Sequence, residues 1–227
     1  MTGTMTDVVL VHSTGQGAAG WARVVDALAA RGYNAHALDL PNDRPELRTD
    51  DYAELVGDRF GRLPSPVVVA HSGSGVLLPA LARRLGAARQ VWLAAWVPDG
   101  TTSFGADARA HLAEAFEPDW VGANPADDDV AARLLFHDCD SVTLAWALGT
   151  RREFLPDAAF DERVELAREI PSTYILATED RTILPGWQRR LARERLGVEP
   201  IEIASGHCPN VSQPDRLAEL LADAAGA

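Results

Sequence analysis

The chain has 227 residues, 47% hydrophobic and 24% charged, which favours one globular domain with a substantial core. Its formal net charge of −12 disfavours nucleic acid and anionic membrane surfaces as partners, because both are negatively charged. No stretch approaches the length of apolar residues that a membrane-spanning helix needs. Residues 1–7 contain neither a basic run nor a long apolar segment, so we expect a cytoplasmic protein without a signal peptide.

Short apolar runs rich in β-branched residues alternate with amphipathic segments along the chain. We predict strands over residues 8–12, 35–40, 67–71, 91–96, 173–177 and 201–204. Several of these runs are apolar throughout, as expected for strands that are covered on both faces. Residues 21–28 and 217–224 each place their apolar side chains on one helical face. This alternation predicts a mostly parallel, six-stranded α/β sheet with helices on both faces.

Residues 102–168 break this alternation. They contain no strand pattern, and prolines and a glycine separate four predicted helices, at 106–116, 128–136, 141–148 and 159–168. We interpret this region as a helical cap inserted into a single domain that spans residues 1–227. Ligands of open parallel sheets bind beyond the carboxyl ends of the strands, so a cap at that edge would cover the site.

The segment at 67–86, VVVAHSGSGVLLPALARRLG, carries the most informative motif. An apolar strand leads into Ser72 and a helix follows, which matches the small-x-Ser-x-small pattern of a nucleophile elbow, with Ala70 and Ser74 at the small positions. Such a turn exposes the serine Oγ above the sheet, and the helix N-terminus favours negative charge there. A simple Gly/Ser-rich turn is the alternative, but the strand–turn–helix context favours a nucleophilic Ser72.

A serine nucleophile needs a base, and the base needs a group that orients it. In a site of this kind the acid and then the histidine follow the serine in the chain. Asp180 and His207 each follow a predicted strand, so both should lie at the same sheet edge as Ser72. Glu179 and Asp99 remain alternatives to Asp180, because both also come shortly after predicted strands.

Four further histidines have structural roles as their simplest explanation. His71 is the variable residue of the elbow, and His36 lies in a predicted strand. His111 and His137 belong to the predicted cap. Of these, His137 is the strongest candidate for a substrate contact, because the cap can face the cavity.

The two cysteines, Cys139 and Cys208, form neither a CxxC pair nor a Cys/His cluster, so we expect no metal site. A disulfide between them is disfavoured in a reducing compartment. All 21 basic residues are arginine, so no lysine can act as a base or form a Schiff base. We expect no cofactor.

Four blocks of the sequence resemble the α/β-hydrolase superfamily: VVLVHSTGQGAAGWARVVDAL, HALDLP, the elbow, and YILATEDRTILPGWQ with ASGHC. More narrowly, the chain resembles the small branch that includes plant methylesterases, hydroxynitrile lyases and related bacterial hydrolases. The similarity runs from about residue 8 to residue 221 and is weakest in the predicted cap. It implies an α/β-hydrolase fold and a small-molecule substrate. Small members of this fold often dimerise, so the resemblance is compatible with either a monomer or a homodimer.

The resemblance also implies roles for individual residues. The backbone N–H groups of Thr14 and Gly73 should form the oxyanion hole. Ser13 replaces a glycine common in hydrolases, and its hydroxyl either contacts the substrate or is tolerated as a small group in a tight loop. Cys208 stands where hydroxynitrile lyases have a lysine, which argues against lyase chemistry and places Cys208 in the pocket wall or in loop packing.

Together these features predict a cofactor-independent serine hydrolase that cleaves a small or medium apolar carboxylic ester. Candidate pocket walls from the predicted cap are Phe116, Trp120, Leu135, Phe136 and Trp146. One alternative keeps the same three residues but processes a lactone or thioester, or cyclises a natural-product intermediate. Another is a ligand-binding module with slow turnover.

Overall fold

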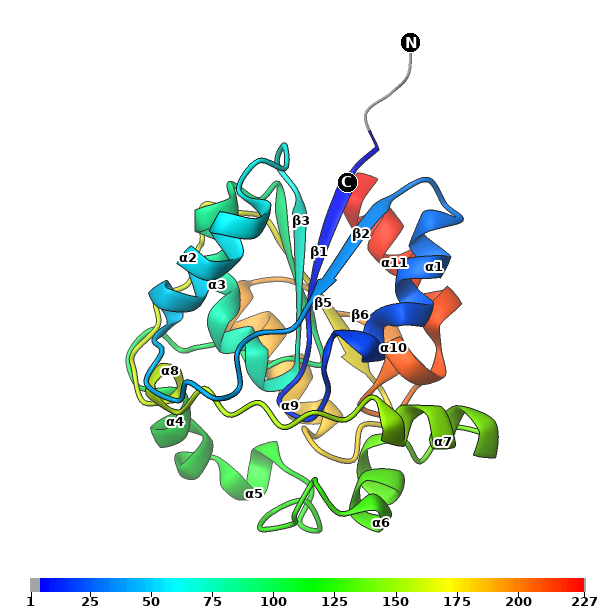
Figure 1. Ribbon diagram of the computed structural model, residues 1–227. Helices are drawn as coiled ribbons and strands as arrows, with labels where there is room; N and C mark the ends of the chain where they lie inside the picture. Colours follow the sequence, from blue (N-terminus) through cyan, green and yellow to red (C-terminus); the bar gives the residue numbers. More distant parts are fainter. Residues whose placement is uncertain (1–4, 227) are drawn as a thin grey trace.

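A computed structural model describes residues 5–226 and contains one six-stranded sheet (Figure 1). Its strands are β1 (Asp7–Val11), β2 (Asn34–Leu38), β3 (Val67–His71), β4 (Arg89–Leu93), β5 (Ser172–Ala177) and β6 (Ile201–Ile203). Their order is β2-β1-β3-β4-β5-β6, and every neighbouring pair is parallel. The predicted parallel sheet is therefore confirmed. Residues 1–4, part of the stretch on which the signal-peptide expectation rests, lie outside the described residues.

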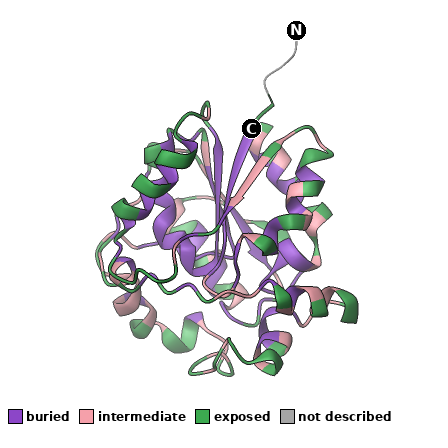
Figure 2. Ribbon diagram, in the orientation of Figure 1, coloured by how far each residue is buried: buried purple, intermediate pink, exposed green. Residues whose placement is uncertain are grey.

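Two apolar layers hold helices against the faces of the sheet. Successive strand residues point to opposite faces, so Val9 and Val11 of β1 pack on one side, and Val8 and Leu10 on the other. The first layer joins the sheet to α2 (Thr49–Phe60), α3 (Leu78–Leu85) and α9 (Pro185–Arg190), and the second to α1 (Ala22–Ala29) and α11 (Pro214–Gly226). The central strands are accordingly buried on both faces (Figure 2).

The region between β4 and β5 is mainly helical, and we call it the α4–α8 segment. It contains α4 (Phe104–Ala110), α5 (Leu112–Ala115), α6 (Asp128–Val130), the π-helical turn η3 (Ala131–Leu135), α7 (Ser141–Gly149) and α8 (Asp157–Phe160). These helices lie beyond the carboxyl ends of the strands (Figure 1). The other short helices are the 3₁₀ turns η1 (Ala18–Trp21) and η2 (Ser72–Leu77), the π-helical turn η4 (Leu191–Leu196), and α10 (Pro209–Ser212).

The fourth strand ends earlier than predicted. The apolar run at 91–96 suggested a strand throughout, but β4 stops at Leu93, and the next residue, Ala94, has a positive φ of 42°. The chain then turns towards the elbow, where the Trp96 N–H donates to the Ser72 carbonyl over 3.0 Å. Residues 94–96 were predicted as strand because they are apolar. In the structure they are buried beside Ser72 without belonging to the sheet.

The predicted helix at 159–168 is wrong. α8 ends at Phe160, and residues 161–171 run in irregular conformation along the core. Two side chains that are distant in the chain bind carbonyl groups of this segment: Arg83 of α3 donates to Leu166 over 2.7 Å, and Gln90 of β4 donates to Ala167 over 2.8 Å. These bonds replace the helical ladder that the carbonyls would otherwise need.

Among residues 5–226, no helix is both long and apolar enough to cross a bilayer.

Candidate active site

Ser72 is the first residue of η2, directly after β3, and its backbone is strained. Its φ of 60° lies in the left-handed region, which costs a non-glycine residue on the order of 1–3 kcal/mol and is held only by surrounding structure. Ala70 and Ser74 are fully buried. The tightest contact, however, is at Gly75, where an added Cβ would lie 2.2 Å from the Trp96 carbonyl oxygen. The elbow pattern in the sequence does not single out this close approach, because it depends on the loop after β4.

The structure brings Ser72, His207 and Asp180 into one hydrogen-bonded line. The Ser72 Oγ hydroxyl donates to His207 Nε2 over 2.9 Å, and His207 Nδ1 donates to Asp180 Oδ2 over 2.7 Å. The three residues follow β3, β6 and β5, whose carboxyl ends meet at one edge of the sheet. All three are buried, so little water competes for these bonds. The line leaves His207 able to accept the Ser72 proton.

The Asp180 carboxylate is held on both oxygens. Oδ1 accepts hydrogen bonds from the Thr182 N–H at 2.7 Å, from the Thr182 hydroxyl at 2.8 Å and from the Ile183 N–H at 3.1 Å. Oδ2 accepts from His207 and from Gln188 Nε2, each at 2.7 Å. These five hydrogen bonds fix the position of the carboxylate that orients the His207 imidazole.

The two alternative acids lie elsewhere. Asp99 accepts the N–H and hydroxyl groups of Thr101 and Thr102 within its own loop. Although its partial burial would raise the pKa, the hydrogen bonds from Thr102 and Thr101 lower the pKa of Asp99 to about 2. Glu179 contributes only backbone groups, since its N–H donates to Ser205 and its carbonyl accepts from His137.

His71 supports the loop that carries His207. Its Nε2 donates to the His207 carbonyl oxygen over 2.8 Å, and the two imidazole rings lie 4.9 Å apart between centroids. Burial, followed by the neighbouring His207, holds the pKa of His71 well below its usual value, so this ring is neutral. His71 therefore packs against the His207 ring and supports its backbone through a hydrogen bond, which fits the structural role expected from the sequence.

The loop after β1 is fixed by a second buried histidine. His12 Nδ1 donates to the Ser13 carbonyl over 2.8 Å, and its Nε2 accepts the Leu40 N–H at 3.1 Å. Burial lowers the pKa of His12, which keeps Nε2 free to accept. On the other side, the Phe154 N–H donates to the Thr14 carbonyl over 2.9 Å, and the Gly17 N–H to Thr150 over 3.1 Å. The segment between α7 and α8 thus runs beside the loop after β1.

Thr14 and Gly73 lie next to each other beside Ser72. A Cβ added to Gly73 would come within 2.9 Å of the Thr14 methyl group and 3.2 Å of the Phe160 ring. Thr14, Gly73 and Ser72 also line one cavity. The two loops that carry the predicted oxyanion-hole amides therefore converge on the Ser72 side chain.

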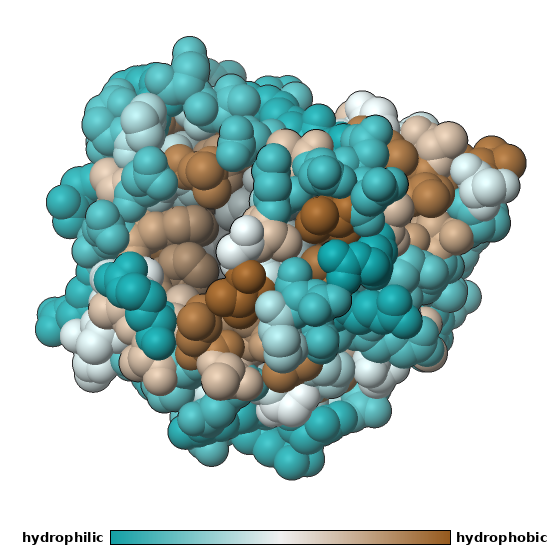
Figure 3. Space-filling view, turned by 90° about the horizontal axis from the view of Figure 1, so that it is seen from below, coloured by the Kyte–Doolittle hydropathy of each residue, from teal (hydrophilic) through white to brown (hydrophobic). Residues whose placement is uncertain are grey.

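A small cavity of about 100 Å³ opens at Ser72. Aromatic and aliphatic side chains dominate its wall, which consists of Trp96, Phe104, Phe116, Trp120, Leu155, Phe160 and Ile183, with Thr182. Seen from the side of the α4–α8 segment, apolar side chains gather near the middle of a largely hydrophilic surface (Figure 3). Phe116 and Trp120 were predicted as walls. Phe104, Phe160 and Leu155 were not, because apolar residues in irregular segments carry no periodic signal.

Four other residues predicted to bind substrate do not line this cavity. The Ser13 hydroxyl accepts the Gly15 N–H at 3.3 Å, so it serves the loop. Trp146 packs under the Arg23 guanidinium, 4.2 Å from its ring centroid. Cys208 is buried with Phe136 and Leu135, and burial, then the charge of Asp180, raises its pKa well above the usual value. It is therefore a neutral packing thiol.

The fourth residue predicted to bind substrate, His137, connects the α4–α8 segment to the loops around His207. Its Nε2 donates to the Glu179 carbonyl over 3.0 Å. The adjacent Asp138 Oδ2 accepts the Gly206 N–H at 2.8 Å, and a Cβ on Gly206 would lie 2.8 Å from either side chain. These contacts explain the position of His137, and a side chain at position 206 would force them to shift.

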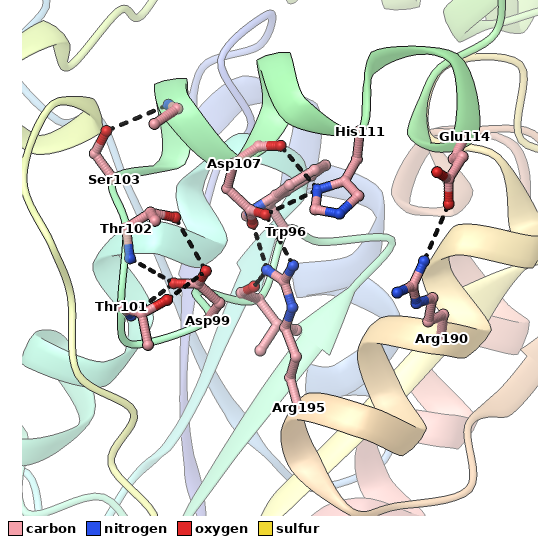
Figure 4. A network of polar contacts seen from close by, with 12 residues as sticks. Trp96, Asp99, Thr101, Thr102, Ser103, Asp107, His111, Glu114, Arg190 and Arg195 are labelled. Carbon is pink, nitrogen blue, oxygen red and sulfur yellow. Dashed lines mark hydrogen bonds and ion pairs between the residues drawn. The ribbon is translucent and has the colours of Figure 1, made fainter.

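A polar network supports the aromatic wall of the cavity (Figure 4). The buried Asp107 carboxylate of α4 accepts the Trp96 indole N–H at 3.1 Å and forms two contacts with the Arg195 guanidinium, at 2.5 and 3.0 Å. Arg195 also donates to the Val97 carbonyl over 2.6 Å. The backbone carbonyl of Asp107 lies 3.1 Å from His111 Nδ1. The network therefore ties α4 and η4 to the tryptophan that faces Ser72.

We expect the Arg195→Met substitution to lower the free energy of unfolding by about 3 kcal/mol, because it leaves the Asp107 charge buried and unpaired. Only 3% of the Asp107 side chain and 14% of the Arg195 side chain are exposed. Urea denaturation followed by tryptophan fluorescence measures this difference. The exposed Arg193, paired with Glu199, provides the matched control, and Arg193→Met should leave the midpoint unchanged. Equal midpoints for both variants would refute a stabilising role for the buried pair.

Within residues 5–226, no group of three or more His, Cys, Asp or Glu side chains is arranged to hold a metal ion.

Comparison with known proteins identifies the family. The model of the Alpha/beta hydrolase family matches residues 8–220, and the chain belongs to this family. A pyrethroid hydrolase from Sphingobium wenxiniae is 26% identical over 99% of this chain and 89% of its own length.

Solved structures agree on the fold. The crystal structure of polyneuridine aldehyde esterase matches with a TM-score of 0.82 and 20% identity, over 97% of this chain and 99% of the other. A pyrethroid hydrolase from Sphingobium faniae JZ-2 matches with a TM-score of 0.74 and 26% identity, over 99% and 98%. The predicted resemblance to the α/β-hydrolase superfamily is confirmed, and the similar proteins include an esterase and pyrethroid hydrolases.

Proposed function

We propose that the chain is a serine hydrolase that cleaves a small or medium apolar carboxylic ester through an acyl-enzyme. The observation that carries this proposal is the hydrogen-bonded line from Ser72 through His207 to Asp180, at the mouth of an aromatic cavity. The names of the similar pyrethroid hydrolases and of polyneuridine aldehyde esterase support hydrolysis as the class of reaction. We further propose that the α4–α8 segment is the cap of a single domain.

In the first half of the reaction, Ser72 Oγ attacks the ester carbonyl carbon while its proton passes to His207 Nε2. Asp180 keeps the other ring proton on Nδ1 and stabilises the imidazolium that forms. The Thr14 and Gly73 N–H groups donate to the oxyanion, and each such donor contributes on the order of 3 kcal/mol to transition-state stabilisation. His207 then gives its proton to the leaving alcohol, and the acyl group stays on Ser72.

In the second half, water enters and His207 takes one of its protons while the oxygen attacks the acyl carbon. Collapse of the second tetrahedral intermediate returns the proton to Ser72 and releases the acid. The aromatic wall favours an apolar group on the substrate, because most of the buried contacts it offers are apolar.

A fluorophosphonate probe and a p-nitrophenyl ester series test the proposal together. We expect the probe to label wild-type protein and to leave Ser72→Ala unlabelled, because the Ser72 oxygen is the atom that attacks phosphorus. Ser74→Ala is the matched control: Ser74 is in the same turn, and its buried hydroxyl has no hydrogen-bond partner among the described residues. It should label like wild type.

The ester series separates the alternatives. Turnover of short and medium apolar acyl esters supports the proposed hydrolase. Faster turnover of lactones or thioesters would favour the alternative chemistry on the same residues. Labelling at Ser72 without turnover of any ester would favour a slow ligand-binding module, and equal labelling of wild type and Ser72→Ala would refute Ser72 as nucleophile.

A further inference from the structure

The buried side chain of Gln188 contacts Asp180, the carboxylate at the end of the Ser72–His207–Asp180 line. Gln188 of α9 has 0% of its surface exposed, and its Nε2 donates to Asp180 Oδ2 over 2.7 Å. The same Nε2 donates to the Ile183 carbonyl over 2.8 Å, and Oε1 accepts the Ala177 N–H at 3.2 Å. An amide N–H can only donate and a carbonyl can only accept, so these partners fix the orientation of the side-chain amide.

The geometry points to Gln188 as a positioning residue for the proposed ester hydrolysis, and this inference rests on that proposed function. Asp180 Oδ2 receives two donors, one from His207 and one from Gln188. With Oδ1 tied to Thr182 and Ile183, the second donor on Oδ2 fixes the plane of the carboxylate. Oδ2 is thereby held in line with His207 Nδ1, and the ring is held towards Ser72.

The side chain at position 188 must donate a hydrogen bond to Asp180, and a second negative charge there would be unfavourable. A carboxylate at 188 would face the carboxylate of Asp180 in a buried setting, where like charges strongly favour binding of a proton. The proton would sit between the two groups, and a protonated carboxyl could still donate to Oδ2 as the amide does. Loss of that proton would turn the donor into a repelling group. A Gln188→Glu variant therefore links the alignment of Asp180 to pH.

Other titratable groups lie near the Asp180 carboxylate and on α9. His207 receives its orientation from Asp180. Burial, then the Asp180 charge, raises the pKa values of Tyr174 in β5 and of Cys208 well above their usual range, so both stay neutral. On α9 itself, Arg189 pairs with Glu202 and Arg190 with Glu194 and Glu114, all at partly exposed positions.

The test compares Gln188→Met and Gln188→Glu with the same changes at Gln90. Gln90 is also buried and donates from Nε2 to Ala167, Ile170 and Ser172, but it lies near the amino end of β4, away from the Ser72 edge. We measure kcat and KM for a p-nitrophenyl ester between about pH 5 and pH 10, an interval that covers the range in which histidines and buried, coupled carboxyl groups titrate. Fluorophosphonate titration counts the folded, reactive protein in each sample.

We expect Gln188→Met to lower kcat by about 10- to 100-fold at every pH, with a small change in KM, because a hydrogen bond to a charged group is lost. For Gln188→Glu, we expect kcat to fall at high pH, where the introduced carboxyl has lost its proton and repels Asp180, giving a falling limb that the wild-type profile lacks. Both Gln90 variants should keep the wild-type profile, even where they lower stability.

A kcat for Gln188→Met within about threefold of wild type would overturn the positioning role. A Gln188→Glu profile parallel to that of wild type would do the same, and it does so even where the methionine variant fails to fold. These results leave an active wild-type enzyme and contradict only the role of Gln188. A wild-type protein that neither labels nor hydrolyses the ester overturns the proposed function, and the inference with it.

Discussion

Replacing His207 with alanine is expected to lower kcat for a p-nitrophenyl ester by about 10⁶-fold, the scale seen when a catalytic histidine is removed from a triad. The Ser72 hydroxyl would lose its hydrogen-bond acceptor at 2.9 Å and would have to transfer its proton to water during attack. The leaving alcohol would also lose its proton donor. Single-turnover kinetics should locate the loss in acylation, because that step needs the base first.

The matched control for this variant is His36→Ala. His36 lies in β2, on the outer edge of the sheet, and is paired with Asp7 at 2.8 Å. Its removal should leave kcat within about twofold of wild type, since surface positions away from the site have small effects. Turnover of the ester by His207→Ala at more than a tenth of the wild-type rate would be incompatible with the proposed mechanism.

The Asp180→Asn variant is expected to lower kcat by about 10⁴-fold while the fold stays intact. An amide at this position can present its NH₂ group to His207 Nδ1, which would then accept the bond. The ring proton would move to Nε2, the atom that must receive the Ser72 proton. Since Oδ1 is held by three donors in the native protein, the amide oxygen is the group expected to take that place.

Asp99→Asn provides the comparison for Asp180→Asn, because both aspartates were candidates for the acid. Asp99 bonds only to its own loop, so its replacement should leave kcat within about twofold of wild type. Steady-state kinetics on matched, titrated samples checks both values. The opposite ranking, with Asp99→Asn the more damaged variant, would assign the orienting role to Asp99.

The sequence predicted the sheet well because its strands are buried on both faces. Val67, Val68 and Val69 form an uninterrupted apolar run and are buried, and β3 spans the predicted residues. Prediction failed where long-range contacts replace local ones. The helix expected at 159–168 is absent because Arg83 and Gln90, far away in the chain, bind carbonyl groups of that region.

The difference between local patterns and long-range contacts also explains which parts of the candidate site were predicted. The Ser72 turn and the placement of Asp180 and His207 after strands are local features, so the motif and the order of elements revealed them. The cavity wall is not local: Trp96 faces Ser72 because Asp107 and Arg195 hold it there. Gln188 gave no signal either, since a glutamine in a helix is ordinary until the carboxylate it contacts is known.

The strand order has a consequence for folding. The proposed site takes Thr14, Ser72, Asp180 and His207 from the segments that follow β1, β3, β5 and β6, so its parts are spread over nearly the whole chain. No contiguous fragment of one half of the molecule contains all four. Such non-local contacts form late and slowly during folding. Appearance of esterase activity during refolding would therefore report completion of the whole sheet, down to the three-residue edge strand β6, and not the earlier collapse of its centre.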